Sequence, residues 1–202
     1  MSRSHLLWLT LFGVIVNQAV AQNRVAVAHL VSQNISGSIV FTETSNGLQV
    51  TGAITGLPAG NYGFHVHELG DTSTCDASGA HFNPEVTNHG GREHNVRHVG
   101  DLGNVVFVGN NTAVATVNFL DTIITLRGRN NILGRTLVLH EQEDDLGQGG
   151  HETSLTTGNA GARVACGVIG IRYPAEPWNS ATTSLPSLVI YALSAMFVYL
   201  SV

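Results

Sequence analysis

The chain contains 202 residues, of which 14 are acidic and nine are basic, and its formal net charge is −5 at pH 7. All nine basic residues are arginine, and they form no continuous run. Because proteins that bind nucleic acid carry a basic patch or stripe, this composition excludes nucleic acid as a partner. The chain length between the two apolar ends suits a single folded domain.

The first 21 residues have the features of a secretory signal peptide. Arg3 precedes an apolar run from Leu6 to Val16, and the small residues Ala19-Val20-Ala21 provide a cleavage site. This order of basic, apolar and small residues predicts a signal peptide over residues 1–21 that is removed on secretion. A buried N-terminal helix is the alternative.

The segment that follows contains short β-strands separated by turns. Alternation of polar and apolar residues, with many β-branched side chains, predicts strands rather than helices. With about eight strands and no amphipathic helix, we expect an all-β antiparallel sandwich or barrel over residues 22–173. The predicted strands are Arg24–Leu30, Gly37–Thr42, Leu48–Thr55, Tyr62–Glu68, Gly103–Val108, Thr112–Phe119, Ile123–Arg127, Thr136–Glu141 and Val164–Ile171.

Two long stretches interrupt this strand pattern. Leu69–Val99 and Gln142–Ala162 are rich in small and polar residues and show almost no periodicity. Irregular stretches of this length within a compact domain are usually functional or disordered. The first contains His81, His89 and His98, so a bound metal would supply the order that its sequence lacks.

Further histidines lie in the predicted strands. His65 and His67 are two residues apart, and side chains at positions i and i+2 of a strand point to the same side. Both rings can therefore approach one ion, and His140, near the end of another strand, would complete a set of three nitrogens. Each histidine alone has a simpler explanation as a surface or core residue, but together they predict a metal site.

A second group combines histidines with a carboxylate. Its members are His81, His89, His98 and Asp101, in the spacing H-x7-H-x8-H-x2-D. Three imidazoles and one carboxylate suit a closed tetrahedral zinc site, whereas an all-nitrogen group with an open position suits copper. Because imidazole has two ring nitrogens, one histidine could bind both metals if it lost its second proton.

Seven motifs carry a resemblance to a known family. They are GFHVHELGD, GAHFNP, NHGG, RHVGDLGN, GRTLVLHE, DDLGQGG and GNAGARVACGVIGI. In residues and spacing they resemble the copper/zinc superoxide dismutases. The resemblance implies an eight-stranded Greek-key barrel with two large functional loops, and one copper and one zinc ion per chain. It also implies conversion of superoxide to O2 and hydrogen peroxide by alternating Cu(II) and Cu(I) steps.

The resemblance further implies a role for each member of the two groups. His81 would bridge both metals as an imidazolate, and would carry a proton to the product. The remaining ligands would divide between the metals: His65, His67 and His140 for copper, and His89, His98 and Asp101 for zinc.

Residues outside the two groups also match the family. Asp144 corresponds to the carboxylate that orients ligands of both sites, and Arg163 to the arginine that holds superoxide beside copper. Cys75 and Cys166 correspond to the family's disulfide. A single pair of cysteines in a secreted chain already indicates a disulfide, with two buried thiols as the alternative.

The sequence departs from the family at the rim of the channel to copper. The family commonly places lysines there, and the corresponding positions hold Gln142 and Thr156, whereas Glu152 is retained. Because local positive charge attracts a small anion, we expect slower catalysis that depends less on salt than is usual for the family.

Two short segments resemble the surfaces through which family members form dimers. They are Ile132-Leu133-Gly134 and Gly170-Ile171, and they predict a homodimer.

Two other functions are the alternatives to a dismutase: a non-catalytic copper-binding or copper-delivery protein with a dismutase-like domain, and a structural adhesion module. The complete ligand set and the presence of Arg163 favour the enzyme.

Two sequons and the C-terminal region indicate the secretory route. Asn34 and Asn110 each begin an acceptor sequence for an N-linked glycan. The apolar tail at 188–202 is too short for a bilayer-spanning helix and follows a polar linker at 174–187 that contains Asn179 and Ser180. This pattern predicts a glycolipid (GPI) anchor at Asn179 or Ser180, with the tail removed.

A short tail anchor and a disordered extension are the alternatives to the glycolipid anchor. With the signal peptide, the anchor predicts an extracellular protein held at the cell surface.

Overall fold

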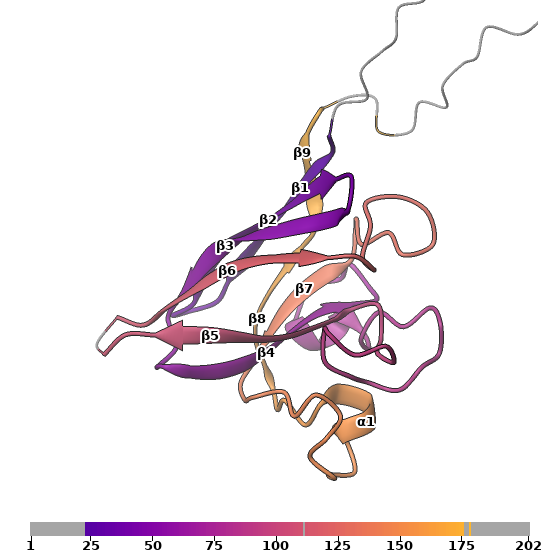
Figure 1. Ribbon diagram of the computed structural model, residues 1–202. Coiled ribbons are helices and arrows are strands. Elements are labelled where there is room, and N and C mark those ends of the chain that lie inside the picture. Colours follow the sequence, from indigo (N-terminus) through magenta and orange to yellow (C-terminus); the bar gives the residue numbers. More distant parts are fainter. Residues whose placement is uncertain (1–22, 111, 176–177, 179–202) are drawn as a thin grey trace, which may run out of the picture.

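The computed structural model describes residues 23–110, 112–175 and 178. The described chain is nearly all β-structure, with one 3-10 turn, η1 (Cys75–Ser78), and a one-turn helix, α1 (Ser154–Thr157) (Figure 1). The strands are β1 (Val25–Val31), β2 (Ser36–Thr44), β3 (Gly47–Thr55), β4 (Gly60–His67), β5 (Asp101–Val108), β6 (Val114–Asp121), β7 (Thr136–His140), β8 (Arg163–Val168) and β9 (Gly170–Tyr173).

The predicted signal peptide, the attachment residues Asn179 and Ser180, and the apolar tail lie outside the described residues. Among the residues that are described, no helix has the length and apolar character needed to cross a membrane.

The strands form a closed antiparallel barrel. Their hydrogen-bonded order is β2-β3-β6-β5-β4-β7-β8-β1, and β1 pairs again with β2, which closes the ring of eight strands. The ninth strand, β9, adds to the outer end of β1. Chain order is broken where β3 pairs with β6 and β4 with β7, as expected for a Greek key. The predicted fold class is confirmed.

Alternate residues of the strands fill the barrel, and this alternation places the predicted metal ligands outside it. Phe64 and Val66 of β4 belong to the hydrophobic core. Since successive side chains of a strand point to opposite faces, His65 and His67 point away from that core. They are nevertheless buried, because the long loops of the chain cover this face of the barrel.

One predicted strand, Ile123–Arg127, is wrong. The carboxylate of Asp121 accepts hydrogen bonds from the backbone N–H groups of Ile123 (2.8 Å) and Ile124 (3.0 Å), which turns the chain directly after β6. Ile124 and Leu126 are both buried. The alternation that suggested a strand therefore arises from a loop that inserts two side chains into the core.

The predicted strand Val164–Ile171 is divided into β8 and β9 at Ile169. The N–H of Ile169 donates to the carbonyl of Arg135, and its carbonyl accepts from Gly134, both at 2.9 Å. These bonds pull the chain from its place beside β7 so that β9 can pair with β1. Every other predicted strand begins and ends within two residues of the observed one.

A buried ion pair joins the first long loop to the barrel. Nη2 of Arg97 lies 2.7 Å from a carboxylate oxygen of Asp121 at the end of β6, and both side chains are buried. Nη1 of Arg97 also donates to the backbone carbonyl of Asp101. Because the two charges compensate each other out of contact with water, removal of either partner leaves an unpaired buried charge.

We therefore expect Asp121→Ala to lower the free energy of unfolding by about 3–5 kcal/mol. The matched control is Arg129→Ala, which removes an exposed ion pair with Glu85 and should cost less than about 1 kcal/mol. Urea denaturation of the metal-loaded proteins measures both. Equal, small losses in the two variants would contradict the structural role of the buried pair.

Candidate metal centre

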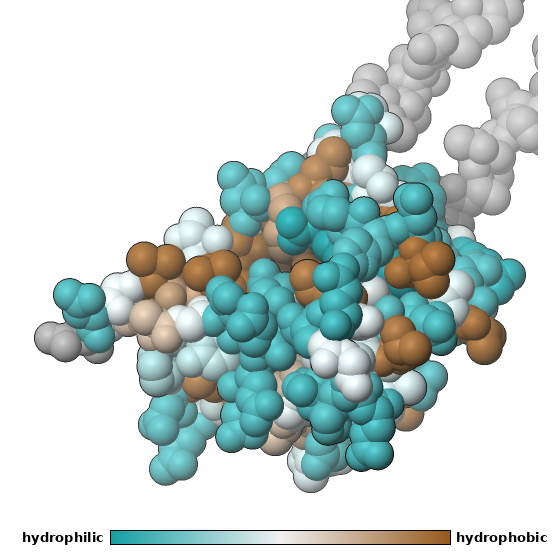
Figure 2. All heavy atoms as spheres, turned by 60° about the horizontal axis from the view of Figure 1, so that its bottom comes forward, coloured by the Kyte–Doolittle hydropathy of each residue, from teal (hydrophilic) through white to brown (hydrophobic). Residues whose placement is uncertain are grey.

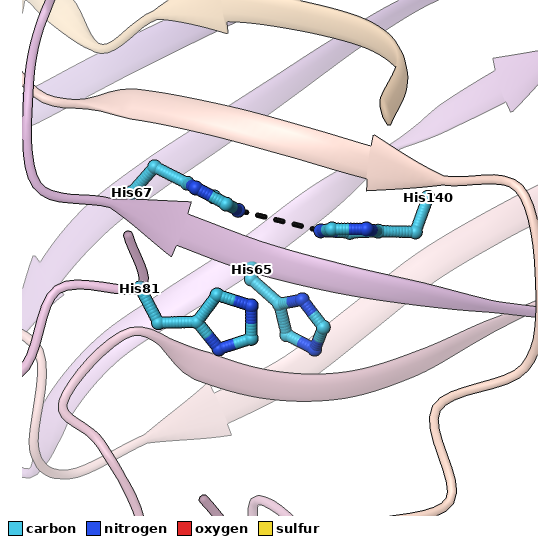
Figure 3. Close-up of side chains that lie close together, drawn as sticks. All are labelled: His65, His67, His81 and His140. Atoms are coloured by element: carbon cyan, nitrogen blue, oxygen red, sulfur yellow. Dashed lines mark hydrogen bonds between the residues drawn. The ribbon is translucent and has the colours of Figure 1, made fainter. Parts of the chain in front are cut away.

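Strands β4 and β7 bring four histidines together on the outer face of the barrel. They pair antiparallel, with Phe64 opposite Leu139, so that His65 and His67 lie beside the end of β7, where His140 is the last residue. His81 joins them because it forms an isolated bridge with His67. Figure 3 shows the rings of His67 and His140 facing each other, with His65 and His81 side by side below them.

The four rings are close enough to share one ion. The ring centroids of His65 and His81 are 4.1 Å apart, and those of His65 and His140 are 4.7 Å apart. Each of the four histidines has a ring nitrogen within 4.8 Å of the corresponding nitrogens of the others. We call this set of His65, His67, His81 and His140 the all-histidine group.

The outer hydrogen bonds of three rings determine which nitrogens face inward. Nδ1 of His67 donates to the carbonyl of Gly79 (2.9 Å), and Nδ1 of His140 to that of Gly161 (3.2 Å). Their Nε2 atoms, 3.3 Å apart, are therefore both unprotonated in the neutral rings. Nε2 of His65 lies 2.8 Å from the Asp144 carboxylate, which can only accept, so Nδ1 of His65 is also unprotonated.

Two inward nitrogens have no partner among the described residues. They are Nδ1 of His65 and Nε2 of His81, both buried. An unsatisfied buried polar atom is costly in a native protein and calls for an explanation such as a bound ion. The donor set, all imidazole nitrogens directed at one point, therefore fits copper.

The second group surrounds the carboxylate of Asp101 at the start of β5. Its Oδ1 atom lies 2.9 Å from Nδ1 of His81, 3.0 Å from Nδ1 of His89 and 3.1 Å from Nδ1 of His98. Its Oδ2 atom accepts from the backbone N–H of His98 (2.8 Å) and of Gly90 (3.1 Å). Nδ1 of His89 is close to the carboxylate but makes no hydrogen bond to it. Three imidazoles and one carboxylate fit zinc.

His81 belongs to both groups, and Asp144 connects them a second time. Nδ1 of His81 faces Asp101 while its Nε2 faces the all-histidine group. The two carboxylate oxygens of Asp144 are each 2.8 Å from an Nε2 atom, one of His65 and one of His89. Asp144 therefore orients one ring of each group at once.

Asn104, which no sequence pattern identifies, holds Asp144 in place. Its side-chain amide donates to the backbone carbonyl of Asp144 (2.9 Å) and accepts from the backbone N–H of the same residue (2.8 Å). Asn104 lies on β5 and Asp144 in the second long loop, so only the folded chain reveals the contact. A lone asparagine in a strand carries no signal that would have identified it.

Burial keeps most of these rings neutral. It lowers the pKa of His65 and of His67 well below the ordinary histidine value, with help from the neighbouring His81. The same two causes lower the pKa of His140 to about 4. Their unprotonated nitrogens are therefore available for a metal at pH 7.

His89 differs because two carboxylates face it. Burial opposes its protonation, but the nearby carboxylates of Asp101 and Asp144 outweigh burial and raise the pKa of His89 to about 9. For Asp101, burial alone would raise the pKa of the carboxyl group, yet the neighbouring histidines hold this pKa below its usual range. Without metal, His89 is thus protonated at pH 7, and zinc binding would release that proton.

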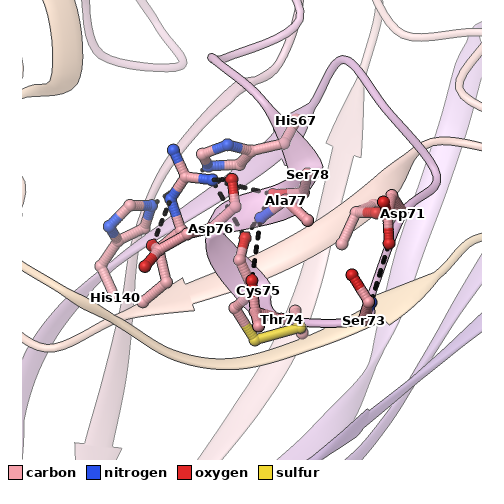
Figure 4. Close-up of a disulfide and its surroundings, with 12 residues drawn as sticks. His67, Asp71, Ser73, Thr74, Cys75, Asp76, Ala77, Ser78 and His140 are labelled. Carbon is pink, nitrogen blue, oxygen red and sulfur yellow. Dashed lines mark hydrogen bonds and ion pairs between the residues drawn. A yellow bond between two sulfur atoms is a disulfide. The ribbon is translucent and has the colours of Figure 1, made fainter.

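The cysteines form the predicted disulfide, which fixes the loop beside the all-histidine group. Cys75 of η1 is bonded to Cys166 of β8, 91 residues further along the chain (Figure 4). Nη1 of Arg163 donates to the carbonyls of Cys75 (3.0 Å) and Asp76 (3.1 Å) and to the hydroxyl of Ser78 (3.0 Å).

Arg163 thereby lies next to two members of the all-histidine group. It is opposite His140 in the pairing of β7 with β8, and its positive charge helps to lower the pKa of His67 and of His140. By contrast, Gln142, Glu152 and Thr156 are exposed on the second long loop. The fold thus fixes the guanidinium of Arg163 beside the all-histidine group.

Comparison with known proteins agrees with this geometry. The profile of the family described as copper/zinc superoxide dismutase (SODC) matches residues 35–169. The chain belongs to this family. It is a superoxide dismutase, an oxidoreductase that acts on superoxide, and its cofactors are copper and zinc.

Two individual proteins are similar to this dismutase. The extracellular superoxide dismutase (Cu-Zn) of Drosophila melanogaster is 47% identical over 156 residues, which cover 73% of this chain and 85% of the fly protein. A crystal structure of the clock protein EA4 is 52% identical with a TM-score of 0.70, and the match covers 73% of this chain and 94% of that one.

Proposed function

We propose that the all-histidine group holds copper and that His81, His89, His98 and Asp101 hold zinc, with His81 shared between the metals. The observation that carries this assignment is the convergence of four unprotonated nitrogens from His65, His67, His81 and His140 on one buried point. The complete donor sets, with Arg163 beside them, favour catalysis over a copper-delivery function.

When bound, copper supplies one-electron redox chemistry with superoxide, and zinc supplies a fixed positive charge on the other side of His81. The chain supplies the positioning. The guanidinium of Arg163, held by three hydrogen bonds at Nη1, presents its remaining N–H groups and its charge to the small anion. Nε2 of His81 would hold a proton for the peroxide product only while it is not bound to copper.

Asp144 has a positioning role in this scheme. Its carboxylate fixes the protonated nitrogen of His65 on the outer side of the ring, so the unprotonated nitrogen stays directed inward. It does the same for His89 in the second group. Loss of this carboxylate would leave both rings free to rotate.

The proposed location is extracellular, on a glycolipid anchor at Asn179 or Ser180. Secretion is supported by the basic, apolar and small residues of 1–21 and by the fly relative, whose name describes an extracellular enzyme. The anchor is supported by the small residues, polar linker and apolar tail near the C-terminus. The two sequons agree with this route, since Asn34 and Asn110 are both exposed.

The proposed assembly is a homodimer formed through apolar residues near β9. Leu69, Val168 and Ile171 are exposed although they are large and apolar, and Leu133 is partly buried against the core. Exposed apolar residues that gather on one surface are typical of protein interfaces. Sedimentation velocity of the soluble enzyme would give a dimer mass on this proposal and a monomer mass against it.

We expect His65→Ala to remove copper but leave zinc. Loss of its Nδ1 atom takes one of four nitrogens from the copper site, so copper per chain should fall from one towards zero and superoxide removal by at least about 100-fold. Metal analysis and activity are measured on the same sample. The control is His29→Ala, an exposed histidine of β1. Unchanged copper content in the His65 variant would contradict the assignment of His65 as a copper ligand.

Lysines at the rim should accelerate the enzyme. We expect Gln142→Lys with Thr156→Lys to raise the rate with superoxide by up to roughly tenfold at low salt and to steepen its decline with ionic strength. Ser45→Lys with Asn46→Lys adds the same charge to the exposed β2–β3 turn as a control. Equal rates in the two double variants would show that rim charge does not limit this enzyme.

Phospholipase C specific for phosphatidylinositol tests the anchor. We expect the treatment to release active enzyme from intact cells, because it cleaves the lipid from a glycolipid-anchored protein. Enzyme that stays on treated cells would indicate a peptide anchor, and enzyme found only in the medium of untreated cells would indicate a secreted form.

A further inference from the structure

The hairpin of β5 and β6 carries exposed valines on its outer face. Val106 and Val108 of β5 are 54% and 69% exposed, and Val114 of β6 is 36% exposed. Val108 and Val114 are direct partners in the β5–β6 pairing, and Val106 is two residues before Val108 on the same face. The three side chains therefore form one surface, which we call the valine patch.

Polar residues separate the valine patch from the far end of β6. The inward residues alternate as expected, since Val105, Phe107, Ala115 and Val117 are buried in the core. The next outward residues of β6, Thr116 and Asn118, are polar, as is usual for the solvent face of an antiparallel sheet, and the apolar Leu120 beyond them is exposed again. Figure 2 shows apolar side chains gathered at the left of the molecule, towards the tip of this hairpin.

A surface hollow of about 520 Å³ adjoins the tip of the same hairpin. Its walls come from the turn after β3 and from the loop between β5 and β6: Thr55, Gly56, Leu57, Pro58, Asn110, Thr112 and Ala113. The volume is in the range of pockets that hold small molecules. Asn110 and Thr112, the first and third residues of a sequon, are both exposed, and neither side chain makes a hydrogen bond within the described chain.

The second sequon lies near the same end of the barrel, although Asn34 does not line the hollow. Gly56 faces the turn between β1 and β2 so closely that a Cβ atom there would lie 2.0 Å from the carbonyl of Asn34. Figure 1 shows the tip of the β5–β6 hairpin at the left of the barrel, away from the start of β1 and the end of β9 at the top. Both sequons therefore lie at the end of the barrel remote from the described chain ends.

We propose that Asn110, two residues after Val108, carries an N-linked glycan whose first sugar lies over the valine patch. N-acetylglucosamine is suited to this position because one face of its pyranose ring presents C–H groups and its acetamide carries a methyl group. These apolar faces pack on the valines while the hydroxyl groups and the outer sugars remain in water. The glycan thus covers an apolar surface that no protein segment covers in the described chain.

The attachment is a substitution at the first sugar. Nδ2 of Asn110 forms a bond to C1 of N-acetylglucosamine and loses a proton, while the bond from C1 to the diphosphate of a lipid-linked oligosaccharide breaks. The donor is thus a lipid diphosphate oligosaccharide of the secretory route, and the leaving group is the lipid diphosphate. The hydroxyl of Thr112 is the third sequon position that this transfer requires.

A second copy of the chain is the weaker candidate for covering the patch. A stable protein interface buries about 800 Å² on each partner, which is much more than three valine side chains at a hairpin tip provide. A glycan at Asn110 would also stand in the way of a second chain at this tip. The proposal rests on the proposed secretion, since only a chain that enters the secretory route meets the donor.

The test uses the full chain secreted from cultured animal cells. Peptide N-glycosidase in heavy-oxygen water converts a glycosylated asparagine to labelled aspartate, so mass spectrometry of the peptide with Asn110 gives its occupancy. We expect most chains to be modified. Native enzyme trimmed by an endoglycosidase that leaves the first sugar should bind the dye ANS as before, whereas complete removal of the glycan should raise ANS fluorescence on the order of twofold.

Two variants separate the valine patch from other effects of sugar loss. Asn110→Gln should reproduce the rise in ANS fluorescence, and adding Val106→Thr, Val108→Thr and Val114→Thr should return it to the starting value. Asn34→Gln, the matched control, removes the other sequon and should leave the fluorescence unchanged.

Active secreted enzyme without a glycan at Asn110 would overturn this proposal alone. An equal rise after trimming to one sugar, or the same rise in the Asn34 variant, would also overturn it. Enzyme that remains inside the cell and unmodified would overturn both this proposal and the proposed extracellular location. A dimer mass that appears only when the glycan is removed would assign the patch to a second copy.

Discussion

The metal centre depends on the carboxylate of Asp144, which contacts His65 through one oxygen and His89 through the other. An imidazole can bind a metal through either nitrogen, so a site of six histidines has many possible arrangements of protons and lone pairs. Asp144 fixes two of them at once, and the carbonyls of Gly79 and Gly161 fix two more. Outer hydrogen bonds thus settle, before a metal arrives, which nitrogens can bind it.

The barrel makes this arrangement possible because its strands are regular where the loops are not. Strand β4 fills the core with Phe64 and Val66 and turns the intervening histidines outward, under loops with little regular structure of their own. The loops are tied to the barrel at separate points: the disulfide of Cys75, the ion pair of Arg97, and the hydrogen bonds to Asp144. Order in the site therefore comes from long-range contacts rather than from local propensity.

Sequence alone could predict the strands and the membership of the site, but not its connections. The alternation of polar and apolar residues predicted both ends of seven strands to within two residues, because it reflects which face of a strand contacts the core. It failed at Ile123–Arg127, where buried residues belong to a turn held by Asp121. The histidines were identifiable through their spacing and the family motifs. Asn104 was not, because a residue that acts only through the backbone of a distant loop leaves no local pattern.

The division of the site into two metal positions that share His81 is tested most directly by crystals of the enzyme loaded with both metals. Anomalous diffraction on each side of the copper and zinc absorption edges locates each element. The account predicts copper among Nδ1 of His65 and the Nε2 atoms of His67, His81 and His140, with zinc beside Asp101. Zinc in the all-histidine group, or a copper position that His81 does not contact, would contradict it.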